Sequence, residues 1–193
     1  MNSREDILNS IRLNVPKSTI ELPNTDIKHM QYKNINEKFA TSLTSVGGNA
    51  IWLNNKSIDD FIKNNYKDVK VIASTCKDVT CNTLKQEDIA DPHELKDVDL
   101  AVINGHFAIA ENGAVWVNEE NLRHRALYFI ANQLLIIVKK EDIVDTMHEA
   151  YKRVDFEKNG YGVFISGPSK TADIEQALVI GAHGPTEACV LFI

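Results

Sequence analysis

The chain contains 193 residues, of which 44% are hydrophobic and 25% charged, and its formal net charge is −6 at pH 7. This composition is typical of a globular protein with a sizeable core, and the acidic balance argues against a general affinity for nucleic acid or anionic membranes. Because no apolar run approaches the ~20 residues that span a bilayer, and the N-terminus lacks the apolar core of a signal peptide, we expect a soluble, cytoplasmic protein without membrane insertion.

The cysteines, Cys76, Cys81 and Cys189, are odd in number and widely spaced, which argues against a disulfide framework. No neighbouring Cys or His completes a zinc or cluster-binding pattern. The sequence also lacks the G-x-G-x-x-G fingerprint of flavin and nicotinamide enzymes. It therefore predicts free thiols, no bound metal and no cofactor.

The N-terminal segment is predicted to be an appendage. Residues 3–14 carry an apolar stripe at helical spacing behind a serine that can cap the helix. Pro16 ends this helix, and a polar segment follows it. We therefore divide the chain into an N-terminal helix and arm over residues 1–32 and an α/β domain over residues 33–193.

Apolar runs alternate with helical patterns through the rest of the chain. The predicted strands cover residues 49–53, 69–75, two or three segments within 99–118, 134–140, 161–167 and 188–193. The predicted helices cover residues 35–45, 57–66 and 141–154, with a helix or loop over 78–90. Continuously apolar strands that alternate with helices must be covered on both faces. The sequence therefore predicts an α/β fold with a Rossmann-like, largely parallel sheet flanked by helices.

In such sheets ligands bind at the carboxyl ends of the strands, and the stretch that begins at Ser166 is expected to lie at one of these places. A strand ends there in a Gly-Pro turn, and a helix is predicted to begin near Thr171. The free N–H groups of its first turn, helped by hydroxyls and an ammonium group, would bind a carboxylate or phosphate. Alternatively, the hydroxyls only cap the helix. The predicted ligand-binding set is Ser166, Gly167, Ser169, Lys170, Thr171, Asp173 and Gly184.

A second turn places His183 between Gly181 and Gly184. An imidazole at this position can bind an anion or transfer a proton, or it can be held structurally by backbone carbonyls. His106 follows Gly105 at the end of a predicted strand, so it too is expected near a strand exit. We take His183 as one of two catalytic candidates.

The other catalytic candidate is Glu111, which precedes the turn dipeptide Asn112-Gly113. A carboxylate presented on a sharp bend can act as a base or as a nucleophile. The alternative is a polar residue that enters a tight hairpin turn between two strands.

Three segments together resemble the LUD domain family of lactate utilisation proteins, and most closely its C-type members: AENGAVWV, FISGPSKTADIEQALVIGAHGP and ACVLFI. The family signature S-G-P-S-[RK]-T-A-D-I-E, followed by G-x-H-G-P, is met at every position. The chain departs from the family at Asn112 and Ala114, where Thr or Ser is usual, so two hydroxyls are absent beside Glu111.

The resemblance implies a fold like that of ribose-phosphate isomerase, glucosamine-phosphate deaminase and the CoA transferases, whose class I members use a glutamate in an E-N-G-like turn as nucleophile. It also implies an accessory or subunit role in the oxidation of L-lactate to pyruvate. The chain would bind a small carboxylate or phosphate ligand, or organise iron–sulfur partner proteins. One alternative is an independent enzyme or binder with Glu111 as the reactive carboxylate and His183 assisting. Another is a regulatory or scaffold protein in which the turns are only structural.

Overall fold

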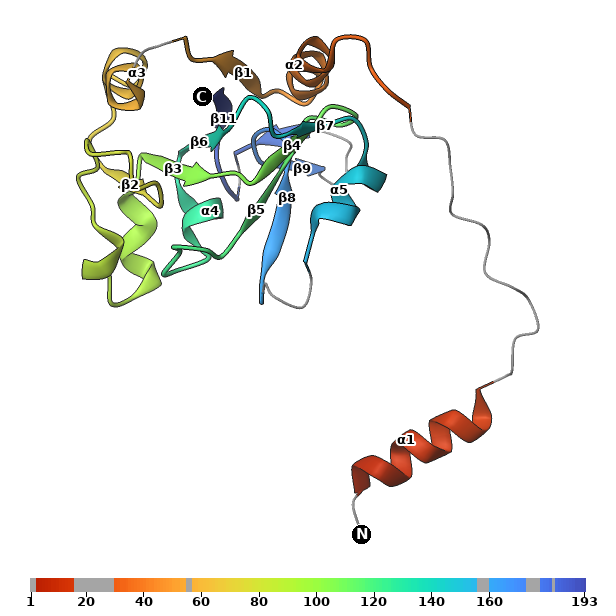
Figure 1. Cartoon of the computed structure of the whole chain (residues 1–193). Coiled ribbons are helices and arrows are strands. Elements are labelled where there is room, and N and C mark those ends of the chain that lie inside the picture. The colour runs from red at the N-terminus through yellow and green to blue at the C-terminus, as the bar shows by residue number, and fades with distance from the viewer. Residues whose placement is uncertain (1–2, 16–29, 55–56, 156–159, 173–177, 182) are drawn as a thin grey trace.

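The centre of the molecule is a five-stranded parallel sheet in the order β1–β11–β6–β3–β2 (Figure 1). The computed structural model describes residues 3–15, 30–54, 57–155, 160–172, 178–181 and 183–193. The strands of this sheet are β1 (Asn49–Trp52), β2 (Ile72–Ser74), β3 (Leu100–Asn104), β6 (Gln133–Val138) and β11 (Glu187–Phe192). The predicted α/β fold with a largely parallel sheet is confirmed.

A second sheet of four strands has the order β7–β4–β5–β8. Its strands are β4 (Phe107–Ile109), β5 (Ala114–Asn118), β7 (Ile143–Val144) and β8 (Gly162–Ile165). β5 pairs antiparallel with both β4 and β8, whereas β7 pairs parallel with β4. The apolar pattern does not distinguish these strands from the parallel ones, because β5 buries all of its residues as a central parallel strand does.

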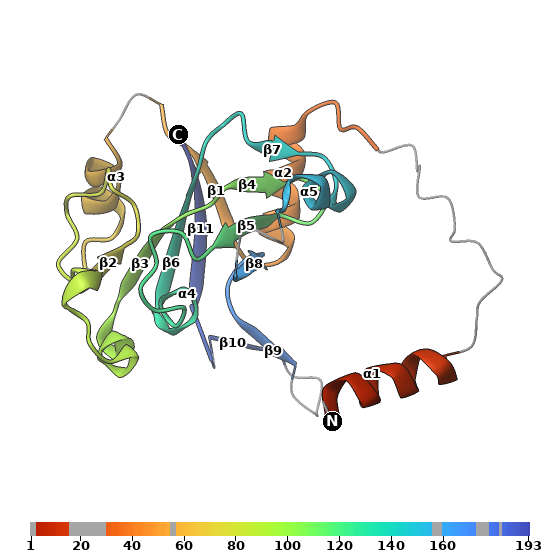
Figure 2. The ribbon, with the colours of Figure 1, turned by 60° about the horizontal axis from the view of Figure 1, so that its bottom comes forward.

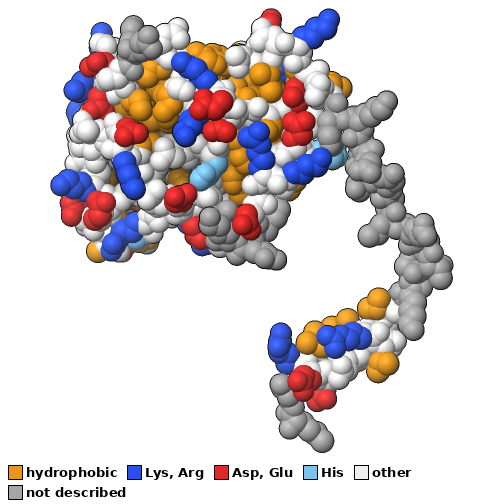
Figure 3. All heavy atoms as spheres, viewed as in Figure 1, with side chains coloured by type: hydrophobic (Ala, Val, Ile, Leu, Met, Phe, Trp, Pro, Cys, Tyr) orange, Lys and Arg blue, Asp and Glu red, His pale blue; other side chains and the backbone are white. Residues whose placement is uncertain are grey.

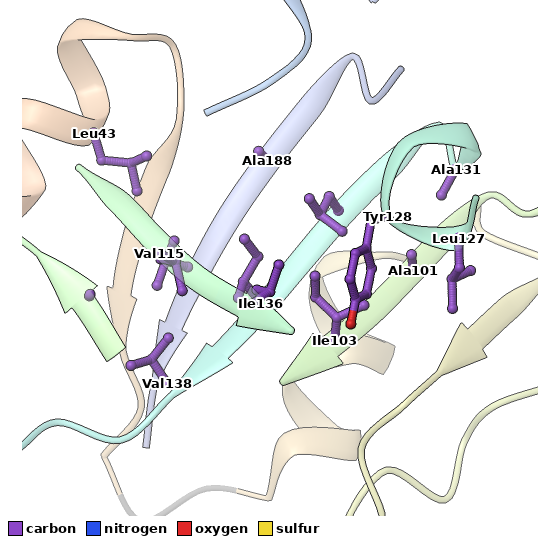
Figure 4. Close-up of a cluster of buried hydrophobic side chains, with 14 of the residues drawn as sticks. Leu43, Ala101, Ile103, Val115, Leu127, Tyr128, Ala131, Ile136, Val138 and Ala188 are labelled. Carbon is purple, nitrogen blue, oxygen red and sulfur yellow. The ribbon is translucent and has the colours of Figure 1, made fainter. Parts of the chain in front are cut away.

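The largest hydrophobic core combines residues of both sheets and two helices, α2 (Ile35–Ser45) and α4 (Leu127–Ile130) (Figure 4). Ile136 of β6 and Ile103 of β3 belong to it, together with Val115 of β5. Leu43 of α2 and Tyr128 of α4 complete it. This packing places the second sheet and both helices on one face of the parallel sheet.

Helix α3 (Ile58–Asn65) covers the other face of the parallel sheet. Phe61 and Ile62 of α3 pack in a separate cluster with Leu135 and Ile137 of β6. Because alternate residues of a strand point to opposite faces, β6 supplies both cores and is apolar from Leu134 to Val138.

The chain between β6 and β8 differs from the helix predicted over residues 141–154. Ile143 and Val144 form β7 instead, and α5 (Met147–Arg153) begins only after Thr146, whose hydroxyl accepts a hydrogen bond from the Glu149 N–H at 3.4 Å. These two β-branched residues pair with β4 in the second sheet. This contact is non-local, and it outweighs the helical spacing of the apolar residues in the sequence. α5 then packs on the second sheet's outer side, where Ala150 is fully buried.

The segment predicted as helix or loop over 78–90 is largely irregular. It contains a 3-10 helix, η1 (Gln86–Asp88), and a second one, η2 (Pro92–Asp97), follows. Asp91 caps η2 in a capping box with Glu94.

Helix α1 (Ser3–Asn14) buries none of its residues. Ile7 is 58% exposed and Ile11 is 53% exposed, and Figure 3 shows hydrophobic atoms on its surface. Most of the predicted arm, residues 16–29, lies outside the described residues. Within the residues that are described, no helix has the length and apolar character required to cross a bilayer.

Candidate functional site

The two turns that carry the sequence signature lie at the amino edge of the parallel sheet. The turn containing His183 immediately precedes β11, and Thr186 at its end donates a backbone hydrogen bond to the carbonyl of Asn132, just before β6. Figure 2 shows β10 (Leu178–Ile180) and β9 (Lys170–Ala172) beyond the amino end of β11, away from the C-terminus. The prediction that this stretch occupies the carboxyl ends of the parallel strands was therefore wrong, because β8, which leads into it, belongs to the other sheet.

The two turns are joined directly by the backbone of Ser169. Its N–H donates to the carbonyl of Pro185 at 2.9 Å, and its carbonyl accepts from the N–H of Gly181 at 3.0 Å. Antiparallel pairing of β9 with β10 continues this contact, with Lys170 opposite Ile180. Two segments that are separate in the sequence thus form one structural unit.

Gly184 is required for this close approach. A Cβ atom at position 184 would lie 2.9 Å from Cβ of Ser169 and 3.1 Å from the carbonyl oxygen of Phe129. Real Cβ atoms essentially never come within 3.0 Å of such neighbours. The second glycine of the signature therefore lets the histidine turn pack against the serine of the other turn.

The helix predicted to begin near Thr171 is not present in the described part of this segment. Lys170–Ala172 is a strand, so the described part of this segment offers no helix N-terminus to an anion. Strand pairing uses backbone N–H groups that a helical first turn would have left free. The side chain of Thr171 and the whole of Asp173 lie outside the described residues, so their assignment to the ligand-binding set stays a prediction.

Gly167 shapes the first turn against the end of α2. Its φ of +71° is in the left-handed region, and a Cβ there would lie 2.7 Å from the carbonyl oxygen of Val46 and 3.3 Å from Nζ of Lys170. Pro168 is buried next to Gly47. Lys170 is exposed, and its ammonium group lies over its own turn, where it is accessible to a ligand.

Ser166 connects this turn to the hairpin that carries Glu111. Its Oγ donates to the carbonyl of Asn112 at 2.9 Å. The Asn112 side chain accepts in turn from the Ala114 N–H at 3.1 Å, closing an Asx-type turn at the two positions where the family usually has hydroxyls. The hairpin and the first signature turn are therefore neighbours.

The Glu111 carboxylate itself has a structural partner. Its Oε2 accepts from the N–H of Met147, the first residue of α5, at 2.8 Å. A carboxylate at this position satisfies a free N–H and complements the helix dipole. This contact favours the turn interpretation of Glu111, and its catalytic role stays a prediction.

His183 is exposed and lines a shallow hollow of about 570 Å³. The other lining residues include Phe129 and Ile130 of α4, both about 40% exposed, and Asn132 at the start of β6. An imidazole at the mouth of a hollow with an amide beside it can bind a small polar molecule. Ser169 and Lys170 do not line this hollow, but the Ser169 backbone bonds to Gly181, which does line it.

The carboxyl edge of the parallel sheet holds a second pocket. The only sequence feature that pointed to it was His106, which was expected near the end of a strand. This cavity of about 460 Å³ lies at the carboxyl ends of β3 and β6, and its polar lining includes Asn104, His106, Glu120 and Lys139. Neither Glu120 nor Lys139 belongs to a recognisable sequence motif. The turn that brings Glu120 towards β3 depends on long-range contacts, which the sequence pattern does not reveal.

Cys76 and Cys189 are buried free cysteines, and neither lines the hollow at His183 or the pocket at His106. Burial raises the pKa of Cys76 and of Cys189 to about 11, so both thiols stay protonated at neutral pH. Among the described residues, no group of three or more His, Cys, Asp or Glu side chains is arranged to hold a metal ion.

Comparisons with known proteins agree with this arrangement. The LUD domain pattern matches residues 76–193, which include both signature turns and the Glu111 hairpin. The chain is 32% identical over 99 residues to lactate utilization protein C of Bacillus pumilus, covering 48% of this chain and 41% of that protein. It is 32% identical over 115 residues to lactate utilization protein C 1 of Bacillus mycoides, covering 56% of this chain and 48% of that protein. The matches thus span less than half the length of these relatives.

A crystal structure of a DUF162 family protein from Deinococcus radiodurans has the same fold. It superposes with a TM-score of 0.66 at 18% identity, covering 82% of this chain and 95% of that one. Since the LUD domain pattern covers well over half of the sequence, the chain belongs to the LUD domain family.

Proposed function

We propose that this protein takes part in lactate utilisation by binding a small carboxylate at the amino edge of its parallel sheet, and that it acts together with iron–sulfur proteins. The single observation that carries the proposal is the double hydrogen bond of the Ser169 backbone to Pro185 and Gly181. It makes one unit of the two turns that carry the resemblance to the lactate utilisation proteins. A ligand at this unit would meet groups from both turns.

The chemistry of the unit suits a carboxylate. Lys170 supplies an accessible positive charge, and a charge-assisted hydrogen bond to a carboxylate is about twice as strong as a neutral one. The Ser169 hydroxyl lies beside Gly184, since a Cβ at position 184 would be 3.2 Å from its Oγ. A hydroxyl donor, an imidazole and an ammonium group carried on two joined turns supply the kinds of group that hold the carboxylate and the hydroxyl of a hydroxy acid.

The cysteines of this chain support the proposal that any iron–sulfur cluster lies in a partner protein. Cluster binding takes four thiolates in the common cases, and the sequence contains three cysteines. Two of these are buried with their pKa raised to about 11, so they are poor metal ligands at neutral pH. Electron transfer in lactate oxidation would then belong to other proteins.

Calorimetric titration of the purified protein with L-lactate and with pyruvate tests the binding step. We expect Lys170→Ala to weaken binding by about tenfold or more, because a hydrogen bond to a charged group contributes roughly 1.5–3 kcal/mol. Lys67→Ala, which removes an equally exposed lysine on the α3 side, should leave binding unchanged. Equal affinity in the two variants, or no binding of either acid, would contradict the proposal.

The partner step needs a separate test in cells. A strain that lacks the gene should grow poorly on L-lactate and recover with the wild-type gene but not with the Lys170→Ala variant. The tagged protein should also copurify with iron and acid-labile sulfide. Normal growth of the deletion strain together with a preparation free of iron would count against a role in lactate oxidation and favour the scaffold interpretation or another pathway.

One observation keeps the enzyme alternative open to test. The Ser166–Asn112 hydrogen bond brings the Glu111 hairpin beside the first signature turn, as a carboxylate acting on a ligand held there would need. Incubation with an acyl-CoA and borohydride traps a glutamyl thioester, and Glu111→Gln is the matched control. Because the Met147 N–H already engages this carboxylate, we expect no trapped product.

A further inference from the structure

A second pocket lies at the opposite end of the parallel sheet from the proposed carboxylate site. It is lined by residues at the carboxyl ends of β3, β6 and β11, the edge at which parallel α/β sheets usually bind ligands. The six residues of β6 separate the two edges by roughly 15–20 Å. With a volume of about 460 Å³, the pocket is in the size range of small-molecule sites.

Gly105 builds the floor of this pocket. A Cβ at this position would lie 2.5 Å from Cγ1 of Val115 and 2.8 Å from Cγ2 of Val138, so only glycine lets the chain cross between the two sheets here. Its N–H donates to the carbonyl of Ile137 at 2.8 Å. The crossing holds Asn104 and His106, its neighbours on either side, at the strand ends.

A tight turn after β5 brings Glu120 to the same pocket. The Glu120 N–H donates to Oδ1 of Asn118 at 2.9 Å, and Asn121 adopts a φ of +58°, in the left-handed region. The buried Gln86 side chain fixes this turn, since its Oε1 accepts from the Arg123 N–H at 3.3 Å. Glu120 is thereby placed with its Oε2 4.0 Å from Nε2 of His106.

The pocket mixes hydrogen-bonding groups of three kinds. Asp78 and Glu120 only accept hydrogen bonds, Lys139 only donates them, and Asn104, Asn121 and His106 can do both. Asp142 is a third carboxylate at the rim, 3.7 Å from the guanidinium of Arg153. With Arg153 counted, three carboxylates face two cations, Lys139 and Arg153, so the net charge of the pocket disfavours a phosphate or carboxylate.

This combination selects a ligand whose own groups donate and accept at several positions. A simple amine would leave Lys139 without an acceptor, and an acid would be repelled by Asp78 and Glu120. Hydroxyl groups satisfy all three kinds of partner. We propose that the carboxyl-edge pocket binds an uncharged polyol, such as an unphosphorylated sugar, independently of the acid bound at the amino edge.

Heteronuclear NMR titration with D-ribose, D-glucose and myo-inositol tests the proposal. We expect at least one of these polyols to shift the amide signals of Gly105, His106 and Asn121 in a saturable way. D-Glucose 6-phosphate should bind more weakly than D-glucose, and glycine should not compete. Failure of all three polyols to shift these signals, or tighter binding of the phosphate ester or of glycine, would overturn the proposal.

Variants separate this pocket from the rest of the surface. Glu120→Ala and Lys139→Ala should each weaken polyol binding by about tenfold, while both side chains are exposed enough that folding is preserved. Glu141→Ala, a neighbouring exposed glutamate outside the pocket, is the matched control and should change nothing. Lys170→Ala should also leave polyol binding intact. An equal loss in the Glu141 variant, or a loss on removing Lys170, would contradict a separate polyol site.

Discussion

Gly113 determines how closely the Glu111 hairpin can approach α2. Its φ is +69°, and a Cβ there would lie 2.6 Å from the backbone nitrogen of Leu43. Ser42, also in α2, donates a hydrogen bond from its hydroxyl to the carbonyl of Ala110 at 2.8 Å. The hairpin and the helix are therefore in direct backbone contact, and because Ser166 bonds to Asn112, the proposed carboxylate site depends on this contact.

We predict that Gly113→Ala lowers the free energy of unfolding by about 2–4 kcal/mol, because the new methyl group meets backbone that cannot move aside and the left-handed φ is strained for alanine. Gly160→Ala is the matched control: its Cβ would meet only the carboxyl group of Glu119, at the end of a partly exposed side chain rather than backbone. Urea unfolding of the three proteins measures the difference. A similar loss in both variants would show that the α2 contact is not the cause.

At the scale of elements, the structure confirms the predictions that depend on local sequence. Helix α3 begins after Ser57, whose hydroxyl accepts from the Asp60 N–H at 3.0 Å, as the serine before an amphipathic run predicts. The predictions that failed needed knowledge of a distant partner. Ile143 and Val144 form a strand because β4 lies beside them, although the sequence Thr146-Met147-His148-Glu149 is a capping signal that could have moved the helix start.

The candidate site divides in the same way. The two turns that carry the sequence signature lie together in the structure, because Ser169 bonds to both Pro185 and Gly181. Their position at the amino edge could not be predicted, since it depends on β8 joining the second sheet through antiparallel pairing with β5. The carboxyl-edge pocket was largely missed for a related reason: Glu120 approaches His106 only through the turn that Gln86 holds from another part of the chain.

The Asp99 side chain joins the chain before β3 to the chain before β2, and its contribution to stability should depend on pH. Asp99 accepts from the N–H groups of Val71 and Lys70 at 2.9 and 2.8 Å, and these bonds hold the pKa of its carboxyl below the usual value. A depressed folded-state pKa contributes stability that is present above the unfolded pKa of ~3.9 and is lost as the pH falls through the folded value.

Asp99→Asn should therefore be less stable than the wild type at pH 7, and the difference should shrink as the pH is lowered from about 5 towards 3. Urea unfolding of both proteins at several pH values measures this difference in the free energy of unfolding. The contributions of the other carboxylates are the same in both proteins and cancel in the difference. Asp97→Asn, at an exposed neighbouring carboxylate, is the control. A wild-type advantage that persists unchanged at pH 3 would contradict the assignment to Asp99.

At the scale of the whole molecule, the two proposed sites lie at opposite edges of one sheet, and their charges differ. The amino edge carries Lys170 and His183, whereas the carboxyl edge carries three carboxylates beside Lys139. β6 is the only strand between β3 and β11, and it is apolar on both faces. The two hollows share no lining residue, so a ligand at one edge would not contact the side chains that hold a ligand at the other.

The N-terminal helix α1 does not pack on the rest of the described chain. α1 buries no residue, and an isolated 12-residue helix is marginal in water, so we expect that α1 contributes little to the stability of the body. Tyr32, by contrast, donates its N–H to Oδ1 of Asp145 at 2.7 Å, and Asn34 caps α2 by accepting from Glu37. Hydrogen bonds to the body are therefore present at Tyr32, two residues before the helix cap at Asn34.

Deletion of residues 1–29 should then leave the melting temperature within about 2 °C of the full chain, because 1 kcal/mol corresponds to roughly 2–4 °C for a protein of this size. Deletion of residues 1–34 removes the Tyr32 bond and the Asn34 cap as well, and should lower the melting temperature by several degrees. Differential scanning calorimetry compares the three proteins. If the shorter deletion already lowers the melting temperature as much as the longer one, residues 1–29 contribute to the stability of the body, which would contradict the prediction.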